Sequence, residues 1–370
     1  MFAIRISVII ITLTLTVFKV QAAEDSTWIK LFNGKDLKEW DFHIKGQEYN
    51  VDPKHTFKVV DGNLFVDYSE YMNWDGEPFG HLGYKLRTFS HYLLRGEYQF
   101  VGKQVTGAPN WAHENNGFML HSQSIASMGK EQDFPISLEA QLLGSDSPMD
   151  GNMNLCTPGT YIHDMSGKLI TDHCIGATKV PRLPAPDWTY SSALVLGDSL
   201  IKFMVGKDTV FKFTKPVMGG GGAGNTTVPI VENQPIKEGY ILIQSESAPI
   251  LFRKIEVLDL VGCMDKSKQA YRSYFVKSNP AACAVVTDVH IPSVFSEDIR
   301  ISEAGHSLVI KGTGSLYGEI ISLNGSLLGS SRGQNSVTLN LLNPKPGLYI
   351  VRVKTSEGTV TRTLPLFQLK

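Results

Sequence analysis

The chain from Trp28 to Leu260 is a succession of short β-prone segments separated by turn signals, with hardly any 3.6-residue helical period. Residues 57–60 and 63–66 flank Asp61-Gly62, a dipeptide that favours a tight β-hairpin. Further segments of this kind occur at residues 95–101, 194–196, 201–205 and 240–244. Many short strands joined by such turns predict an all-β fold of the sandwich type.

The length and charge of the chain limit its organisation and its partners. With 370 residues it is too long for one small core, so one large domain or two unequal domains are expected. The formal net charge is -1, and no basic patch stands out in the sequence. Both features argue against a nucleic-acid partner.

The first 22 residues have the features of a secretory signal peptide. Arg5 gives a short positive region, residues 8–18 give an apolar region, and Val20-Gln21-Ala22 resembles a cleavage site. The apolar run is too short for a stable membrane-spanning helix. We therefore expect a secreted or cell-surface protein after removal of residues 1–22, with a retained anchor as the alternative.

Four cysteines in an exported chain predict two disulfides, although the sequence alone allows three pairings. We predict the pairs Cys156–Cys174 and Cys263–Cys283, because each closes a short loop that can lie within one module. No C-x-x-C spacing is present in the sequence, so no metal ligands are assigned.

Three regions follow the predicted signal peptide. Residues 26–260 form the large strand-rich domain, and residues 261–284 form a polar, disulfide-closed connector. Residues 298–370 contain further short strands spaced by Gly and Asn turns, which predicts a small C-terminal β-sandwich.

Polar residues alternate with apolar ones in three of the predicted strands. In residues 136–142, Ser137, Glu139 and Gln141 share one face while the apolar residues share the other. The same alternation places Asn115 with His121, and Gln244 with Glu246. Amides and carboxylates suit the alternating hydroxyl groups of a saccharide. The alternative is that these side chains only hydrogen-bond one another across the sheet.

Several ordered motifs resemble those of the 3-keto-disaccharide hydrolase domain family. Residues 31–40, Leu-Phe-Asn-Gly-Lys-Asp-Leu-Lys-Glu-Trp, are similar to its opening signature. Further similarities follow in the family's order at residues 60–64, 96–98, 115–121, 139–141, 188, 239–244 and 252–255. The resemblance implies a concanavalin A-like jelly-roll β-sandwich that cleaves sugars oxidised to a ketone at carbon 3. His121 and Glu246 depart from the family pattern, where many members carry Arg and His.

The implied reaction is removal of the hydrogen at carbon 2, loss of the group at carbon 1 and addition of water. It needs a general base and support for a developing oxyanion. Glu139 or His121 is the candidate base. Arg253, Gln141 or a divalent cation as a cofactor is the candidate oxyanion support, although Arg253 can equally clamp a carboxylate.

Two other activities remain open at this point. Glu139 and Glu246 could form the carboxylate pair of a conventional glycosidase. A non-catalytic, lectin-like protein would use the same side chains only to bind saccharide. In each case the predicted substrate-binding residues are Asn115, Gln141, Gln244, Arg253 and Trp111. The Trp111 ring can serve as a sugar platform or pack in the core.

The C-terminal region resembles a second family. Residues 323–328 and 346–353 are similar to the sorting domain of type IX secretion substrates, and residues 262–265 are similar to repeats found beside it. The resemblance implies the secretion machinery as a partner of residues 298–370. A purely structural accessory module is the alternative.

Overall fold

The computed structural model describes residues 27–283 and 300–366, except for residues 305–306, 323–325, 341–346 and 356–357. The predicted signal peptide therefore lies outside the described residues. The chain divides into two compact units, residues 1–283 and 284–370.

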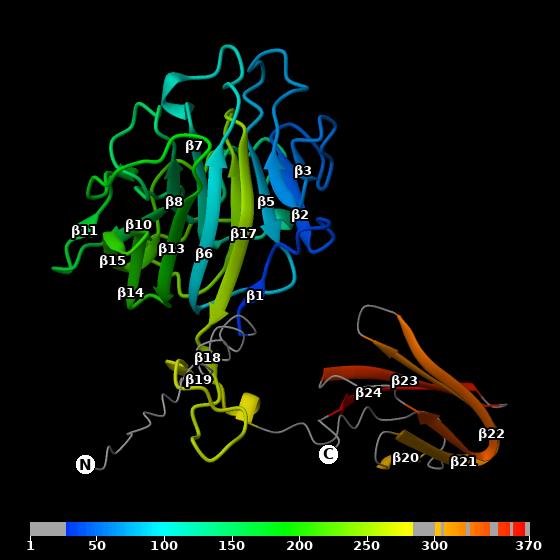
Figure 1. The fold of residues 1–370 in the computed structure, drawn as a ribbon. Helices are drawn as coiled ribbons and strands as arrows, with labels where there is room; N and C mark the ends of the chain where they lie inside the picture. The colour runs from blue at the N-terminus through cyan, green and yellow to red at the C-terminus, as the bar shows by residue number, and fades with distance from the viewer. Residues whose placement is uncertain are drawn as a thin grey trace, which may run out of the picture. The chain divides into compact units, whose positions relative to one another are not determined.

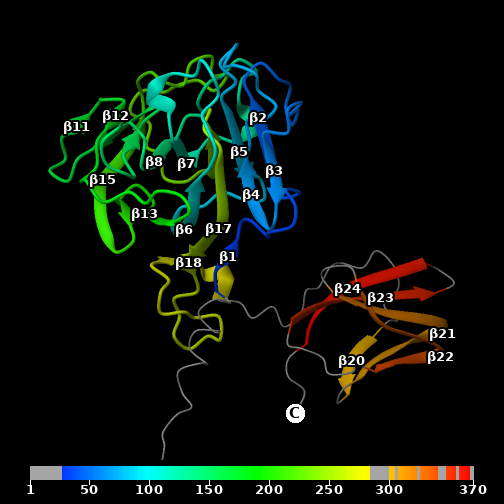
Figure 2. The same cartoon turned by 45° about the horizontal axis from the view of Figure 1, so that its top comes forward.

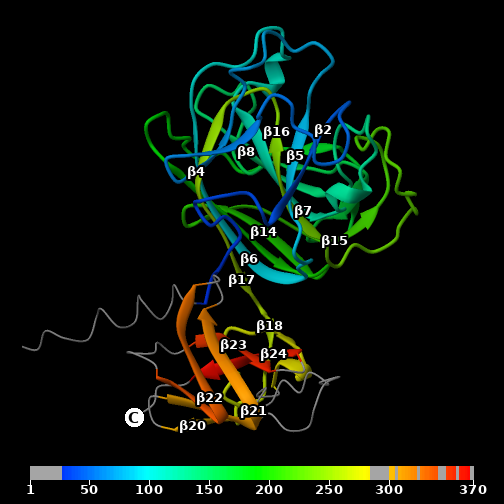
Figure 3. The same cartoon turned by 90° about the vertical axis from the view of Figure 1, so that its right-hand side faces the viewer.

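The first unit is a sandwich of two antiparallel sheets, seen as separate layers in Figure 3. The larger, ten-stranded sheet contains β1 (Ile29–Lys30), β3 (Phe57–Val60), β4 (Asn63–Val66), β6 (His91–Phe100), β10 (Thr160–His163), β11 (Leu169–Ile170), β13 (Thr189–Leu196), β14 (Leu200–Val205), β15 (Asp208–Met218) and β17 (Ile250–Asp259). Its order is β11-β10-β15-β14-β13-β6-β17-β4-β3, with β1 paired to β17 (Figure 1).

The smaller sheet carries the polar alternation found in the sequence. It contains β2 (Trp40–Ile44), β5 (Gly80–Tyr84), β7 (Asn115–Ser122), β8 (Leu138–Leu143), β9 (Leu155–Cys156), β12 (Cys174–Ile175) and β16 (Tyr240–Ser245), in the order β12-β9-β8-β7-β16-β5-β2. Figure 2 shows β12, β8 and β7 following one another across this sheet. Two short 3-10 helices, Asn110–Ala112 and Ile125–Ser127, precede and follow β7. The central position of β7 between β8 and β16 brings the three polar segments together.

The core lies between the two sheets. Along β6, every second side chain is buried, because Tyr92, Leu94 and Tyr98 point toward the other sheet. β7 and β8 are buried along their whole length, since loops also cover their outer face. All-β architecture with a concanavalin A-like sandwich is thus as predicted.

Two local predictions are confirmed. β3 and β4 pair around Asp61-Gly62, whose φ angles of 49° and 77° are those of a tight hairpin turn. The disulfides are Cys156–Cys174 and Cys263–Cys283, which close separations of 18 and 20 residues. β18 (Val261–Gly262) directly precedes the second pair, β19 (Lys277–Ser278) lies between its two cysteines, and the 3-10 helix Pro280–Cys283 ends on the second of them.

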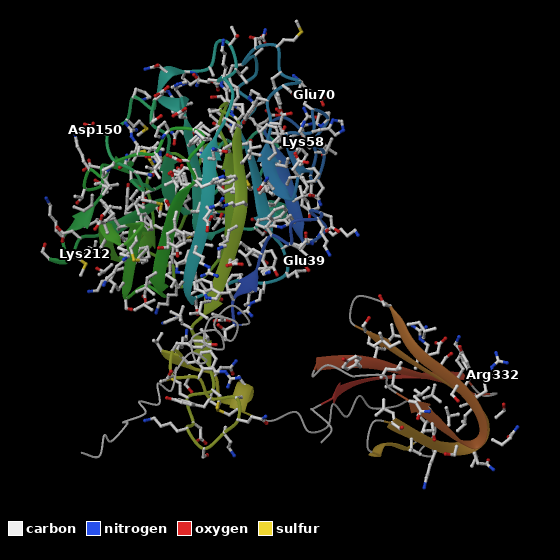
Figure 4. All side chains as sticks on the ribbon, in the orientation of Figure 1. Glu39, Lys58, Glu70, Asp150, Lys212 and Arg332 are labelled. Atoms are coloured by element: carbon white, nitrogen blue, oxygen red, sulfur yellow. A yellow bond between two sulfur atoms is a disulfide. The ribbon has the colours of Figure 1, made fainter. Side chains whose placement is uncertain are left out.

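The second unit is one five-stranded sheet built from β20 (Arg300–Ala304), β21 (Ser307–Ser322), β22 (Leu327–Asn340), β23 (Gly347–Thr355) and β24 (Gly358–Leu366). The register between β21 and β22 shifts between Lys311 and Ser315, and β20 and β23 pair with opposite halves of β21. Leu308 and Ile320 from these halves belong to one apolar core. On the outside, Arg332 (labelled in Figure 4) stacks over Tyr317 at 5.0 Å.

Within the described ranges, no helix combines the length and the apolar character that crossing a lipid bilayer requires.

Candidate active site

A cavity of about 320 Å³ lies on the outer face of the seven-stranded sheet. Leu138, Ala140 and Leu142 of β8 point into the sandwich core, so Glu139 and Gln141 point outward into this cavity. Glu246, just after β16, also lines it. The cavity thus joins two carboxyl groups whose residues are 107 positions apart in the chain (246 minus 139).

Glu139 owes its position to a glycine on the neighbouring strand. A Cβ atom on Gly117 of β7 would come within 2.6 Å of Glu139 Oε1, so the carboxyl group lies directly over this glycine. Because β7 separates β8 from β16, this placement brings the carboxyl group toward the strand that leads to Glu246. The strand backbones themselves are two spacings, about 9.5 Å, apart.

Both carboxyl groups are buried, and neither forms an ion pair with another described residue. Glu139 is 4% exposed and Glu246 3% exposed. Burial raises the pKa of Glu139 to about 8. Burial, together with the charge of Glu139, raises the pKa of Glu246 well above its usual range. The pair therefore loses its protons in two steps, the second against the charge left by the first.

The cavity also offers hydrogen-bonding atoms without protein partners. Among the described residues, Glu139 Oε1, Glu246 Oε2 and Gln141 Oε1 are buried and lack a hydrogen-bond partner. Buried polar atoms are seldom left unpaired, since each one costs free energy. These three oxygens are available to a ligand.

Two predicted binding residues lie on the same face but do not line the cavity. Asn115 Nδ2 donates a weak hydrogen bond to the Trp111 carbonyl at 3.4 Å, while its Oδ1 has no partner in the described structure. Gln244 is fully buried opposite His81 of β5, and neither atom of its amide group has a described partner. Asn115 contacts the cavity lining through Met149, whose Sδ lies 3.8 Å from Asn115 Nδ2.

Trp111 stands at the rim, as a sugar platform requires. The residue is 46% exposed and lines the cavity, and its ring stacks on Phe79 with centroids 6.2 Å apart. The stacking fixes the orientation of the exposed indole face.

His121 is not brought to this cavity, and the shared face expected for Asn115 and His121 is not found. Tyr240 pairs with Ser122 and Leu242 with Met119, so β7 holds one more residue than β16 at this point. This β-bulge, with a φ of 48° at His121, turns the imidazole away from Glu139. The ring instead packs edge-on against Tyr92 and its Nε2 lies 3.2 Å from the Gly197 carbonyl.

We expect His121→Asn to leave the turnover of any substrate cleaved in the Glu139 cavity within about twofold of the original protein, because no reacting group is lost. Steady-state kinetics of the folded variant, checked by circular dichroism, measures this. A loss as large as that caused by changing Glu139 would return His121 to the list of candidate bases.

Arg253 also lies elsewhere. It belongs to β17 of the ten-stranded sheet, forms an ion pair with Glu97 and lies over the Trp188 ring at 4.5 Å. The arginine therefore clamps a carboxylate, as one reading of the sequence allowed, but that carboxylate is Glu97 and not Glu139. The cavity receives no oxyanion support from Arg253.

The structure adds a wall to the site that the sequence did not predict. His173, Met149 and the Cys156–Cys174 disulfide all line the cavity. Cys156 is the cross-strand neighbour of Glu139, so the disulfide holds His173 close to the carboxyl pair. The predicted disulfide was the sequence signal for this wall. Its position beside Glu139 follows from the register of β8 with β9, which the sequence does not show.

A group suited to a cation occurs outside the cavity. Within the described part of the chain, ligand atoms of His113, Glu114 and Asp146 lie within 4.8 Å of one another. They are half-buried or exposed, and none of them lines the cavity. We assign no cation to the carboxyl pair.

The antiparallel sandwich and its outward cavity define a protein of the concanavalin A-like class. Residues 27–258, more than half of the chain, match the family model of the 3-keto-alpha-glucoside-1,2-lyase-like domain. The chain therefore belongs to this family of carbohydrate-active proteins.

Solved structures resemble parts of this chain at low sequence identity. A structure described as a glycosyl hydrolase from Parabacteroides distasonis is 17% identical over 65% of this chain and 96% of that chain, with a TM-score of 0.37. The carbohydrate-binding module CBM66 from Bacillus subtilis is 11% identical over 48% and 80%, with a TM-score of 0.28. The Ca2+-bound VIP36 exoplasmic/lumenal domain is 10% identical over 63% and 90%, with a TM-score of 0.37. These values are too low to indicate the chemistry of this chain. No curated protein sequence matches it.

Proposed function

We propose that this protein cleaves the glycosidic bond of 3-keto-glycosides, including 3-keto-disaccharides, by elimination followed by addition of water. The observation that supports the proposal is the pair of buried carboxyl groups, Glu139 and Glu246, facing one cavity of sugar-binding size. Family membership supports the choice of substrate class.

In the first half of the reaction, Glu139 acts as the base. Its carboxylate removes the proton from carbon 2, which the ketone at carbon 3 acidifies. The electron pair forms a double bond between carbons 2 and 1, and the bond from carbon 1 to the leaving oxygen breaks. The protonated Glu246 donates its proton to that oxygen, which releases an alcohol and a conjugated enone.

In the second half, the two residues exchange roles. Water adds to carbon 1 and gives a proton to the Glu246 carboxylate, while Glu139 returns its proton to carbon 2. The net result is hydrolysis, and both side chains regain their starting states. A base with a pKa of about 8 suits this chemistry, because it is stronger than an ordinary carboxylate yet partly ionised near neutral pH.

The remaining cavity residues would bind the sugar. Gln141 Oε1 can accept a hydrogen bond from a hydroxyl group, and the exposed face of Trp111 can stack on the ring. Neither residue needs to titrate.

The competing function is lectin-like binding without catalysis. Protonated Glu139 and Glu246 would then only exchange hydrogen bonds with sugar hydroxyls, which their unpartnered oxygens also permit.

Incubation of the purified protein with 3-keto-trehalose and, separately, with trehalose distinguishes these functions. We expect release of glucose and 3-ketoglucose from the oxidised sugar alone, because only its carbon 2 hydrogen is acidified. Binding of both sugars without cleavage would establish the lectin-like function. Equal cleavage of both would favour a conventional glycosidase with two carboxylates.

We also propose that the protein is exported after loss of residues 1–22 and that residues 298–370 direct it to a type IX secretion machinery. The motifs at residues 346–353 support this role.

Truncation after Cys283 should leave a folded first unit with unchanged specific activity, because the division between the two units falls there and the second disulfide is retained. Thermal melting and activity of the shortened protein measure this. In a host with type IX secretion, cell fractionation should show loss of surface delivery, and normal delivery would exclude the sorting role.

A further inference from the structure

A second cavity, of about 520 Å³, lies at the end of β7 that carries His121. His121 and Ser122 line it and are 3% and 2% exposed, while Ile136 and Ile236 are apolar, buried parts of its lining. Lys237, Glu238 and Lys277 line it with exposed side chains. The lining residues of the two cavities do not overlap.

The β-bulge in β7 places the imidazole of His121 at this second cavity. It turns His121 away from the Glu139 face, and Gly239 allows the close approach of the bulged backbone. A Cβ atom on Gly239 would lie only 2.3 Å from the carbonyl carbon of His121. Bulges commonly re-aim a side chain next to a functional site.

The hydrogen bonds of His121 determine what it offers to a ligand. Its Nε2 lies next to the Gly197 carbonyl, which can only accept, so this nitrogen carries the hydrogen and Nδ1 is an acceptor. Burial lowers the pKa of His121 to about 4, although the Gly197 hydrogen bond opposes the shift, so the ring is neutral near pH 7.

Two adjacent buried groups thus lack partners within the described structure, namely His121 Nδ1 and Ser122 Oγ. The first accepts a hydrogen bond, and the second can both donate and accept. Leaving both unpaired costs free energy in the free protein. A ligand that supplies hydroxyl groups would recover this cost.

We propose that this second cavity binds a neutral saccharide, whose hydroxyl groups pair with His121 Nδ1 and Ser122 Oγ. The volume is ample for one or two sugar rings. The exposed Lys237 and Lys277 could pair with an anion, but a carboxylate has no hydrogen to donate to the His121 Nδ1 lone pair, and an apolar ligand would leave both buried groups unpaired. The proposal does not depend on catalysis in the Glu139 cavity.

Saturation-transfer NMR with glucose, trehalose and cellobiose tests the proposal. Trp111→Ala should weaken binding in the first cavity, so that a further loss caused by Ser122→Ala in this variant reports on the second. Adding Ser122→Ala to Trp111→Ala should weaken the remaining binding about fivefold, the loss expected for one hydrogen bond. Ser122→Ala alone should keep the melting temperature, because its hydroxyl has no described protein partner to lose.

Three results would overturn the proposal. The first is that none of the three sugars gives saturation transfer with the Trp111→Ala variant. The second is equal transfer in Trp111→Ala and in the double variant that also carries Ser122→Ala. The third is that glucuronate binds more strongly than the neutral sugars and that this binding disappears in Lys237→Ala. Turnover of 3-keto-trehalose is a separate readout, which Ser122→Ala should not change. A protein without that turnover can still show binding in the second cavity, so the two proposals fail independently.

Discussion

Glu139→Gln should lower the turnover of 3-keto-trehalose by about a hundredfold or more, because it removes the proposed base while keeping nearly the same shape. The amide should preserve most ground-state binding, so the loss should appear in kcat more than in KM. Steady-state kinetics with the oxidised disaccharide measures both constants. A variant that keeps the original turnover would eliminate Glu139 as the base.

Glu97→Gln is the matched control. Glu97 lies on β6 of the ten-stranded sheet and pairs with Arg253 and Lys254. Partial burial favours its neutral form, but the hydrogen bonds with these two cations lower the pKa of Glu97 below its ordinary value. The same chemical change there should leave turnover intact and slightly reduce stability.

The stability of the first unit should fall as the pH rises from about 4.5 to about 8. Burial raises the pKa of Glu139 from 4.5 to about 8, so the folded chain holds a proton that the unfolded chain has already lost in this interval. This contribution to stability is fully present below pH 4.5 and is lost as the pH rises through the raised pKa of the folded chain. Glu246 acts in the same direction, because its pKa is also raised.

Thermal melting of residues 23–283 between pH 4.5 and 9 measures this effect, with the Glu139→Gln variant beside it. The original protein should lose several degrees more than the variant across this range. The variant should also be more stable at pH 8.5, since it no longer buries an ionising group. Parallel curves for the two proteins would show that Glu139 is not held in its neutral form.

Turnover should rise over the same pH range, because the base must be ionised.

The sequence determined the local features of the site. Alternation in residues 136–142 placed Glu139 and Gln141 opposite Leu138 and Ala140, and the structure has the same arrangement. The Asp61-Gly62 turn and the two disulfide pairs were also correctly predicted. These features depend on side-chain period, turn conformation or short loop closure, which are properties of neighbouring residues.

Only the tertiary structure decided which of the candidate residues meet. One extra residue in β7 moved His121 from the Glu139 face to the second cavity, and membership of the other sheet gave Arg253 to Glu97. The register of β8 with β9 brought the disulfide and His173 beside Glu139. Strand order, register and bulges are set by pairing between distant segments, and a one-residue shift exchanges the two faces of a strand. A local period carries no information on that pairing, so it predicts which side chains share a strand face but not which strands share a cavity.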